Sequence, residues 1–343
     1  MTKSILVLKL GSASITTNGE IDESIIEDLT RQVAKLAANY HLILVSSGAV
    51  AAGKKFLKNY KGKMTERKAA AAIGNPLLLG TYSKYFQPYG ISIAQSLCER
   101  QHFSNRTQFL QLKETYEELW RNGVIPIANE NDVVSNLELK FSDNDELATL
   151  LGIGFGASLI LLGTSVAGVL DKDGQVVNRI DQINSDVFSL ATKNTSEVGL
   201  GGMTSKLTFA NLAATMGIKV VIFGVRTEDG ILKAVEEKTG TVCEPRICTI
   251  SARNKWLASG SLVTGRLTID AGACKAIRDR KSLLAVGVSS VQNPFDTAEI
   301  FEIIDQEGCI VAVAKSKVSS AGITQDAKQH NLEVANASDI VFL

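Results

Sequence analysis

The sequence predicts an α/β fold in which helices cover both faces of a mostly parallel sheet, followed by a small β-barrel. Over residues 1–250, short apolar runs rich in β-formers alternate with helical segments, as buried parallel strands and their crossover helices do. From residue 265 the period shortens to closely spaced strands, which is typical of a small barrel. We therefore place a larger domain at residues 1–250 and a smaller one at residues 259–343.

The strand predicted at residues 4–8 ends in a polar segment, Lys9-Leu10-Gly11-Ser12. A lysine, a hydroxyl and backbone N–H groups at one sheet edge can cradle an anion, but an ordinary strand-to-loop turn has the same composition. Residues 22–38 show the apolar spacing of an amphipathic helix. The next strand, residues 41–45, ends in Ser46-Ser47-Gly48-Ala49, which either docks a carboxylate or phosphate or simply caps the next helix.

The rest of the larger domain continues the alternation. In order, we predict a helix at 50–57, a long helical region at 64–85 interrupted near Gly74-Asn75-Pro76, a strand at 90–97, a helix at 105–120, strands at 124–128 and 158–162, a helix at 207–216, a strand at 219–223 and a helix at 228–237. The strand at 158–162 runs into Gly163-Thr164-Ser165, another polar strand end.

Polar residues concentrate between the strands predicted at 124–128 and 158–162. Asn129-Glu130-Asn131-Asp132 directly follow one strand, and Asp143-Asn144-Asp145 precede an apolar helix from Leu147. In open α/β sheets, ligands bind at the carboxyl ends of strands. Acids, amides and a lysine in so short a span suit a small charged molecule that carries an amino group. A solvated loop with a helix N-cap at Ser142 or Asp143 is the alternative.

A glycine-rich segment, residues 197–206, precedes the helix predicted at 207–216. Three glycines, the hydroxyls of Thr204 and Ser205, and Lys206 at the head of a helix form a second candidate cradle for phosphate. A flexible linker would have a similar composition.

Composition excludes several classes of protein. Lys plus Arg and Asp plus Glu both number 36, so no net charge favours nucleic acid or a membrane surface. No apolar run approaches the roughly 18 residues of a membrane span, and the N-terminus lacks the apolar stretch of a signal peptide. The 5 cysteines are scattered without a zinc-binding pattern, so we expect reduced thiols, no metal site and a cytoplasmic protein.

The smaller domain carries short elements only. We predict strands at 266–269, 283–288, 299–304 and 309–314 and a small helix at 273–278.

These motifs, in this order, resemble the amino acid kinase family, and within it the members that phosphorylate the side-chain carboxylate of L-glutamate in proline biosynthesis. The resemblance rests on five segments of the larger domain: 9–12, 46–49, 129–132, 143–145 and 199–206. In the smaller domain, Thr268-Ile269-Asp270-Ala271-Gly272-Ala273 and the segment 282–287 are similar to the PUA domain. The resemblance implies a three-layer sandwich with a mostly parallel central sheet, plus a PUA-like barrel.

The resemblance also implies the role of each residue. Lys9 and Lys206 would contact the phosphates and stabilise the transferred group, and Asp145 would hold both lysines. The residues expected to bind glutamate are Ser47, Gly48, Asn129, Asp132, Asp143 and Asn144. The residues expected to bind ATP are Lys9, Gly11, Thr164, Ser165, Leu200, Gly201, Gly202, Met203, Thr204, Ser205 and Lys206.

The same family implies ATP as phosphoryl donor, Mg²⁺ carried by the ATP phosphates, feedback inhibition by proline and a homo-oligomer, dimer or tetramer. The chain departs from the family pattern at two places. It has Ser165 where the family commonly has an aspartate, and Gly174 where a proline follows the aspartate. The first lies in the expected nucleotide pocket and the second in a loop.

Three alternatives stay open on the sequence alone. A kinase of the same fold could act on another carboxylate, carbamate or phosphate acceptor. The PUA-like domain, with a mildly basic junction around Arg253 and Lys255, could bind RNA, although the balanced charge argues against nucleic acid as a partner. The loss of an acid at Ser165 raises the third alternative, a non-catalytic metabolite sensor.

Overall fold

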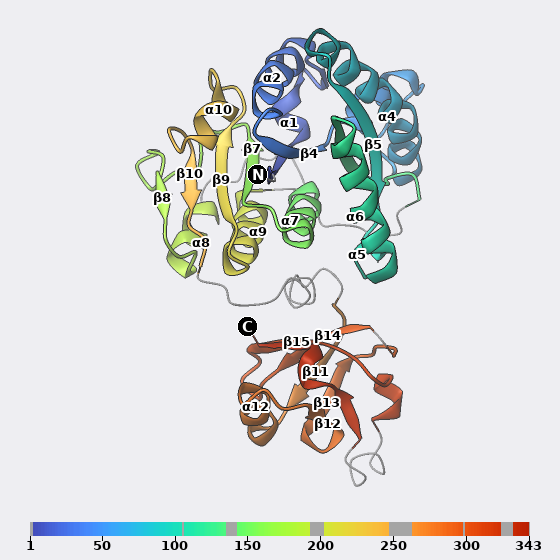
Figure 1. The fold of residues 1–343 in the computed structure, drawn as a ribbon, viewed down its shortest axis with the longest axis vertical. Coiled ribbons are helices and arrows are strands. Elements are labelled where there is room, and N and C mark those ends of the chain that lie inside the picture. The colour runs from blue at the N-terminus through green and yellow to red at the C-terminus, as the bar shows by residue number, and fades with distance from the viewer. Residues whose placement is uncertain are drawn as a thin grey trace. The chain divides into compact units, whose positions relative to one another are not determined.

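The computed structural model describes residues 3–104, 106–134, 143–192, 202–246, 263–297, 299–323 and 332–342. The chain forms two compact units, one with residues 1–99 and 110–248 and the other with residues 100–109 and 249–343. Figure 1 shows an α/β unit and a strand-rich unit. Among the described helices, none is both long and apolar enough to cross a membrane.

An eight-stranded sheet forms the centre of the first unit. In spatial order its strands are β5 (Ser92–Cys98), β6 (Val124–Glu130), β4 (Tyr40–Ser46), β1 (Ser4–Leu10), β7 (Leu159–Thr164), β9 (Lys219–Gly224), β10 (Thr241–Cys243) and β8 (Arg179–Ile180). The strands from β5 to β9 are parallel, and only the β9–β10 pairing is antiparallel. The prediction of a mostly parallel sheet is confirmed.

Strand β1 lies where the strand order reverses, because it pairs with β4 on one side and β7 on the other. Such a switch point leaves a crevice at the carboxyl ends of the strands, where ligands bind. Four of the predicted polar segments follow the carboxyl ends of β1, β4, β6 and β7, so the sheet brings them to the same edge.

Helices cover both faces of the sheet (Figure 1). Helices α2 (Glu23–Leu36), α4 (Met64–Phe86) and α10 (Gly230–Val235) contribute to one apolar core with the sheet. Helices α6 (Arg106–Arg121), α7 (Asn144–Phe155) and α9 (Met203–Thr215) lie on the other face. The result is the predicted three-layer sandwich.

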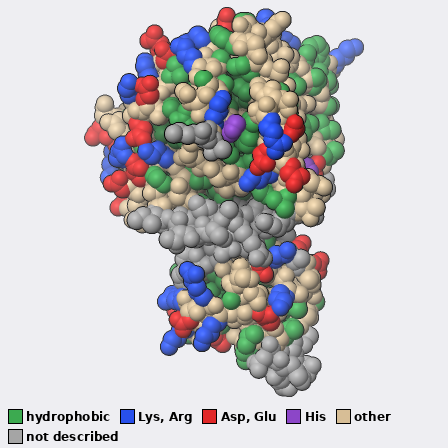
Figure 2. All heavy atoms as spheres, viewed as in Figure 1, with side chains coloured by type: hydrophobic (Ala, Val, Ile, Leu, Met, Phe, Trp, Pro, Cys, Tyr) green, Lys and Arg blue, Asp and Glu red, His purple; other side chains and the backbone are tan. Residues whose placement is uncertain are grey.

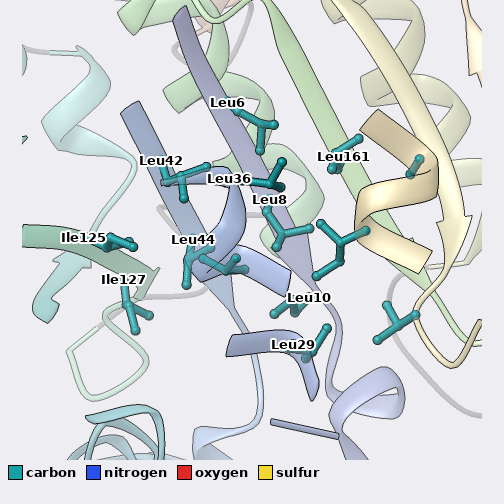
Figure 3. Packing of buried hydrophobic residues seen from close by; sticks show 14 of the residues in the cluster. Leu6, Leu8, Leu10, Leu29, Leu36, Leu42, Leu44, Ile125, Ile127 and Leu161 are labelled. Carbon is teal, nitrogen blue, oxygen red and sulfur yellow. The ribbon is translucent and has the colours of Figure 1, made fainter. Parts of the chain in front are cut away.

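The alternation of side chains along β1 decides which way Lys9 points. Figure 3 shows Leu6, Leu8 and Leu10 in the core that contains α2. Because successive strand residues point to opposite faces, Val7 and Lys9 face the other layer, where α7 lies. A Cβ atom added to Gly152 of α7 would lie 3.7 Å from Val7 Cγ2, which confirms the close approach of that helix.

The predicted interruption of the long helix near Gly74-Asn75-Pro76 is wrong, because α4 continues through Pro76. Its packing against α3 (Ala49–Gly53) supports it there. A Cβ at Gly74 would lie 1.7 Å from the Ala49 carbonyl oxygen, and one at Gly53 would lie 2.0 Å from that of Ala70. Two glycines thus allow backbone-to-backbone contact, which the sequence pattern did not reveal.

Other boundaries also differ from prediction. Helix α7 starts at Asn144 rather than near Leu147, and α9 starts at Met203 rather than 207, because polar residues form the first turn of each. The predicted helix at 50–57 is the short α3 followed by a 3-10 turn at residues 54–56. Elements absent from the prediction include the strands β8 and β10, and also α1 (Ser12–Ile15), β2 (Thr16–Thr17), β3 (Glu20–Ile21), α5 (Gln101–Ser104) and α8 (Ser185–Thr192).

The second unit contains a five-stranded sheet in the order β13 (Val288–Asn293), β11 (Val263–Ile269), β14 (Ile300–Ile304), β15 (Ile310–Lys315) and β17 (Ile340–Phe342). A second sheet pairs β12 (Leu283–Leu284) with β16 (Glu333–Ala335), and α12 (Ala271–Arg278) packs nearby. The strand predicted at 283–288 is therefore broken by a 3-10 turn at residues 285–287. Stacked Phe295 and Phe301, with ring centroids 4.4 Å apart, lie in its core.

Several charged side chains of the first unit form ion pairs. Lys84 lies 2.6 Å from Glu23, and Arg31 lies 2.5 Å from both Asp28 and Asp229. Figure 2 shows Lys and Arg side chains intermingled with Asp and Glu side chains over the face of this unit in view. That face carries no large patch of a single sign, in keeping with the balanced composition.

Candidate active site

Two lysines meet one aspartate at the floor of the crevice. Lys9 Nζ lies 2.7 Å from Oδ1 of Asp145, and Lys206 Nζ lies 2.8 Å from Oδ2 of the same carboxylate. Lys9 comes from the end of β1, Asp145 from the first turn of α7, and Lys206 from the first turn of α9. All three side chains are buried, with Asp145 at 0% exposure. The structure thus brings together the three residues that the sequence grouped as catalytic.

The local sequence explains how Asp145 reaches this place. Asp143 caps α7, since its carboxylate accepts hydrogen bonds from the backbone N–H groups of Asp145 at 2.8 Å and Glu146 at 3.1 Å. The Ser205 hydroxyl donates to the other oxygen of Asp143, which joins the starts of α7 and α9. A carboxylate in the first turn of a helix is favoured by the helix dipole, so Asp145 stabilises α7 while it holds the two lysines.

Burial and charge shift the pKa values of this cluster. Burial, and to a smaller degree the neighbouring charge of Lys206, holds the pKa of Lys9 below its usual value of 10.5, although Asp145 acts in the opposite direction. Burial alone would raise the pKa of Asp145, but the charges of Lys9 and Lys206 outweigh it and bring that pKa below 3.8. Asp145 is therefore ionised at neutral pH.

Hydrogen bonds between amide side chains connect the three layers of the sandwich at the site. Asn144 Nδ2 donates to Ser47 Oγ at 2.7 Å and to Asn129 Oδ1 at 2.9 Å. Asn129 in turn donates from Nδ2 to Asn75 Oδ1 at 3.3 Å, and its own Oδ1 also accepts from the backbone N–H of Glu130 at 3.0 Å. The ends of β4 and β6, the start of α7 and the middle of α4 are tied together by side-chain hydrogen bonds.

Gly48, between Ser47 and α3, requires the conformational freedom of glycine. Its φ is +110°, and a Cβ there would lie 2.9 Å from Ile15 Cδ1 and 3.1 Å from Ile21 Cδ1. The β2–β3 hairpin thus packs directly on the loop after β4 and helps to hold Ser47 at the edge of the crevice.

A cavity of about 530 Å³ lies above the ion-pair cluster. Its lining includes most of the predicted site residues: Lys9, Gly11, Ser47, Gly48, Asn129, Asp132, Asp143, Asn144, Thr164, Ser165, Gly202, Met203 and Lys206. Asp145 is buried next to Lys9 and Lys206, while Thr204 and Ser205 are not part of the lining. The predicted residues Leu200 and Gly201 lie outside the described residues. The residues expected to bind glutamate and those expected to bind ATP therefore line one cavity.

Several lining residues were not predicted, and Arg67 is the most informative of them. It is half-buried near the start of α4, and its side chain forms no ion pair or hydrogen bond with the described residues, so its guanidinium is available to an anion. Nothing in the sequence marks it, because an arginine in a polar first turn reads as a solvated surface residue. The same holds for Asn75, which looked like part of a helix break.

The departure at Gly174 also has a structural counterpart. Gly174 adopts a φ of +77°, which a proline cannot adopt, and Asp171 closes the turn by accepting hydrogen bonds from the backbone N–H groups of Asp173 and Gln175, both at 2.9 Å. The loop therefore has its own tight turn. Ser165, at the other departure, lines the cavity beside Thr164.

Comparison with known proteins defines the class. A model of the amino acid kinase family matches residues 4–224, and a model of the PUA domain matches residues 265–336. The chain belongs to the amino acid kinase family and carries a PUA domain after the kinase fold.

Curated relatives narrow the likeness further. The chain is 34% identical over 342 residues to the glutamate 5-kinase of Caldanaerobacter subterraneus. This alignment covers 96% of this chain and 92% of the relative. It is 36% identical over 324 residues to the glutamate 5-kinase of Thermotoga maritima, with 93% and 90% covered. Among solved structures, carbamate kinase from Giardia lamblia bound to AMP-PNP matches with a TM-score of 0.51 and 17% identity over 71% of this chain and 99% of that one. This last likeness supports the fold alone.

Proposed function

We propose that this kinase transfers the γ-phosphoryl group of ATP to the side-chain carboxylate of L-glutamate. The product is γ-glutamyl phosphate, the first intermediate of proline biosynthesis, and the activity is that of a glutamate 5-kinase. The observation that carries the proposal is the pair of lysines, Lys9 and Lys206, held by Asp145 at the floor of a cavity of about 530 Å³. Such a volume is in the range of small-molecule sites.

The acceptor needs no general base. A glutamate side chain has a pKa near ~4.3, so at neutral pH its carboxylate is already an ionised nucleophile. No histidine is among the residues that line the described cavity, which suits a reaction in which no proton has to be removed. The barrier is electrostatic, because one anion must approach another.

The lysine cluster lowers that barrier. Two ammonium groups face one carboxylate, so the Lys9–Asp145–Lys206 cluster itself carries one positive charge in excess. Preorganised cations stabilise the charge that develops on a phosphoryl group in flight, and this is the main contribution of the protein to phosphoryl transfer. We assign Lys9 and Lys206 to the transferred group, and Asp145 to the positioning of both.

The polar strand ends would bind glutamate at one end of the cavity. Ser47, Gly48, Asn129, Asp132, Asp143 and Asn144 all belong to the cavity lining. Acceptors such as the Asp132 carboxylate suit the ammonium group, and the Ser47 hydroxyl suits a carboxylate. Arg67, near the start of the helix that packs on α3, adds a cation for the second carboxylate of the substrate.

The other end of the cavity would take ATP. Gly11, Thr164, Ser165 and the start of α9 from Gly202 line this end. A side chain at Gly11 would start 3.5 Å from Lys9 Nζ, so the glycine leaves room for phosphates beside the ammonium group. When bound, ATP supplies the phosphoryl group, and Mg²⁺ on its phosphates offsets part of their charge.

The relatives favour L-glutamate over the alternative acceptors. The relatives from Caldanaerobacter and Thermotoga are both named glutamate 5-kinase and align over nine-tenths of their own length, PUA domain included. We extend the proposal to feedback inhibition by proline, a dimeric or tetrameric assembly, a catalytic domain at residues 1–250 and a PUA-like domain at residues 259–343.

A coupled assay of ADP release with a panel of acceptors tests the proposed function. We expect turnover with L-glutamate and ATP–Mg²⁺, and not with carbamate, UMP or N-acetylglutamate. Hydroxylamine should trap the acyl phosphate as a hydroxamate. Proline should lower the rate, and size-exclusion chromatography with light scattering should give the assembly. Turnover that prefers another acceptor would refute the assignment of glutamate.

A further inference from the structure

Asn75 is a buried residue of the amide chain that does not line the cavity. It lies in α4 with 6% of its surface exposed, and among the described residues its side chain hydrogen-bonds to Asn129 alone. Its Oδ1 accepts from Asn129 Nδ2 at 3.3 Å, while its own Nδ2 is buried without a hydrogen-bond partner among the described residues. The oxygen of Asn75 is thus the atom in use, and the nitrogen is not.

The hydrogen bonds of this chain run in one direction. Asn129 uses Nδ2 toward Asn75, so its Oδ1 is turned toward Asn144. Asn144 then has to offer Nδ2, and it donates both of its N–H groups, one to Asn129 and one to Ser47 Oγ. Since the Ser47 oxygen already accepts a hydrogen bond, its own O–H is left to donate elsewhere.

The direction of these hydrogen bonds decides whether Ser47 and Asn144 present a donor or an acceptor to the cavity. Ser47 lines the cavity and has a hydrogen to donate, which suits a carboxylate. Asn144 also lines it, and its Oδ1 is a buried acceptor without a partner in the described part of the chain, which suits an ammonium group. Buried polar atoms are almost always hydrogen-bonded, so an unsatisfied acceptor here indicates a ligand.

If the hydrogen bonds between these amides ran in the opposite direction, Ser47 and Asn144 would present the opposite polarity to the cavity. If Asn129 turned its Nδ2 toward Asn144, Asn144 would have to accept this hydrogen bond with Oδ1. That oxygen would then take the hydrogen of Ser47, which leaves only lone pairs for a carboxylate. The Nδ2 of Asn144 would stand where the free acceptor stood and would repel an ammonium group. The site would bind an amino acid poorly in this state.

We propose that Asn75 is a positioning residue for the amino acid substrate. Through Asn129 it sets the direction of the amide chain, so that Ser47 donates to a carboxylate and Asn144 Oδ1 accepts from the ammonium group. The inference rests on the proposed function and deepens it. The backbone N–H of Glu130 supports the same orientation of Asn129 from the other side, at 3.0 Å from Oδ1. Asn75 is the side chain that, together with this backbone group, fixes the orientation of the Asn129 amide.

The fold keeps Asn75 in place by rigid means. It lies between Gly74, whose backbone touches that of α3, and Pro76, which fixes the local φ. Helix α4 is also anchored about two turns further on, where Tyr82 shares a 2.8 Å hydrogen bond with Ser46 at the end of β4. A displacement of Asn75 would therefore require a displacement of α4 against α3 and β4.

The test uses Asn75→Leu, which keeps the volume and removes the acceptor. Without it, Asn129 Nδ2 loses a buried partner and the amide is free to turn. We expect the KM for L-glutamate to rise about tenfold or more. The KM for ATP should stay within about twofold. Asn75→Asp keeps an oxygen at the same place and should restore most of the glutamate affinity. Asn75→Ala gives the same measurement without added apolar bulk if Asn75→Leu folds poorly.

A matched control and a double-mutant cycle separate positioning from stability. Leu78→Ala removes a buried side chain 4% exposed on the same helix, and should lower the melting temperature without a change in the glutamate KM. In an Asn129→Ala background, Asn75→Leu should have no further effect, because Asn75 acts only through Asn129.

Three results would overturn the inference. These are an equal rise of both KM values in Asn75→Leu, an Asn75→Asp variant as poor as Asn75→Leu, or full additivity with Asn129→Ala. Wild-type protein that does not turn over glutamate would refute the proposed function, and the role of Asn75 in glutamate binding with it. Normal wild-type turnover combined with any of the three results refutes the role of Asn75 alone.

Discussion

The ammonium group of Lys9 lies 2.7 Å from a carboxylate oxygen of Asp145, although one residue ends the first strand and the other starts a helix far along the chain. Lys206 occupies the second oxygen of the same carboxylate. Each lysine is thus held by one oxygen, and neither can move without a change at Asp145.

Replacement of either lysine by methionine, which keeps the buried stem and removes the charge, should lower kcat by about 10²–10³. The other lysine still pairs with Asp145 in each variant, so the fold should persist. Steady-state kinetics with saturating glutamate and ATP give kcat, and thermal unfolding checks the fold. Retention of more than about a tenth of kcat by a folded variant would remove that lysine from catalysis.

The rate should fall in alkaline solution earlier than an ordinary lysine would allow. Because burial holds the pKa of Lys9 below 10.5, its charge is lost as pH rises through that lowered value. Asp145 acts to raise this pKa, so Asp145→Asn should move the alkaline limb to lower pH. A pH profile of kcat for both proteins measures the shift. An alkaline limb that stays in place in Asp145→Asn would contradict the assignment to Lys9.

Asp145 should also contribute to stability in a defined pH range. Its pKa in the folded protein lies below the usual 3.8, so between these two values the unfolded chain binds more protons, and the free energy of unfolding rises with pH. This stability is present above pH 3.8 and is lost as pH falls through the lowered value. Asp145→Asn should lack this part of the slope.

At neutral pH, Asp145→Asn leaves two buried lysines without their anion, which should lower the free energy of unfolding by about 3–5 kcal/mol. Urea unfolding between pH 2.5 and 7 gives both quantities. An unchanged acid slope in Asp145→Asn would show that other carboxylates dominate.

Asp132→Ala should chiefly raise the KM for L-glutamate, because Asp132 lines the cavity among the residues proposed to bind glutamate and lies outside the Lys9–Asp145–Lys206 cluster. The value of kcat should change far less than in the lysine variants. Arg67→Ala should behave in the same way if its guanidinium meets the second carboxylate. A fall in kcat with an unchanged glutamate KM would place either residue in the transfer step instead.

The contact between α3 and α4 makes a prediction about two glycines of one helix. A Cβ at Gly74 would lie 1.7 Å from the Ala49 carbonyl oxygen, whereas a Cβ at Gly80 would meet nothing within 4 Å. Gly74→Ala should therefore destabilise the protein by about 1–3 kcal/mol or more. Gly80→Ala should stabilise it by up to about 1 kcal/mol through helix propensity. Thermal unfolding of the two variants compares them directly.

Much of the fold and the site could be predicted, because the signals were local. Apolar runs and helical periods located the strands of the larger domain, and the parallel order then required their polar ends to meet at one edge. Lys9, Asp145 and Lys206 each lie at the end or the start of such an element, but their positions alone did not group them. The resemblance to a known family assigned their roles, which spacing alone could not do.

What the sequence did not reveal depends on contacts between distant segments. Pro76 reads as a helix break, and only the close approach of Gly74 to α3 explains why the helix continues. Asn75 and Arg67 have no local mark of function, since their importance comes from what α4 packs against. The polar first turns of α7 and α9 were missed because apolar periodicity begins after them.

The position of β1 has a consequence for synthesis. Among the strands of this sheet, β1 is made before the others, and it lies inside the finished sheet with β4 on one side and β7 on the other. A nascent chain on the ribosome must therefore keep one edge of β1 unpaired until residues 159–164 have emerged, and an unpaired apolar strand invites association with other chains. Conditions that slow translation between β4 and β7 should increase the protein's dependence on chaperones.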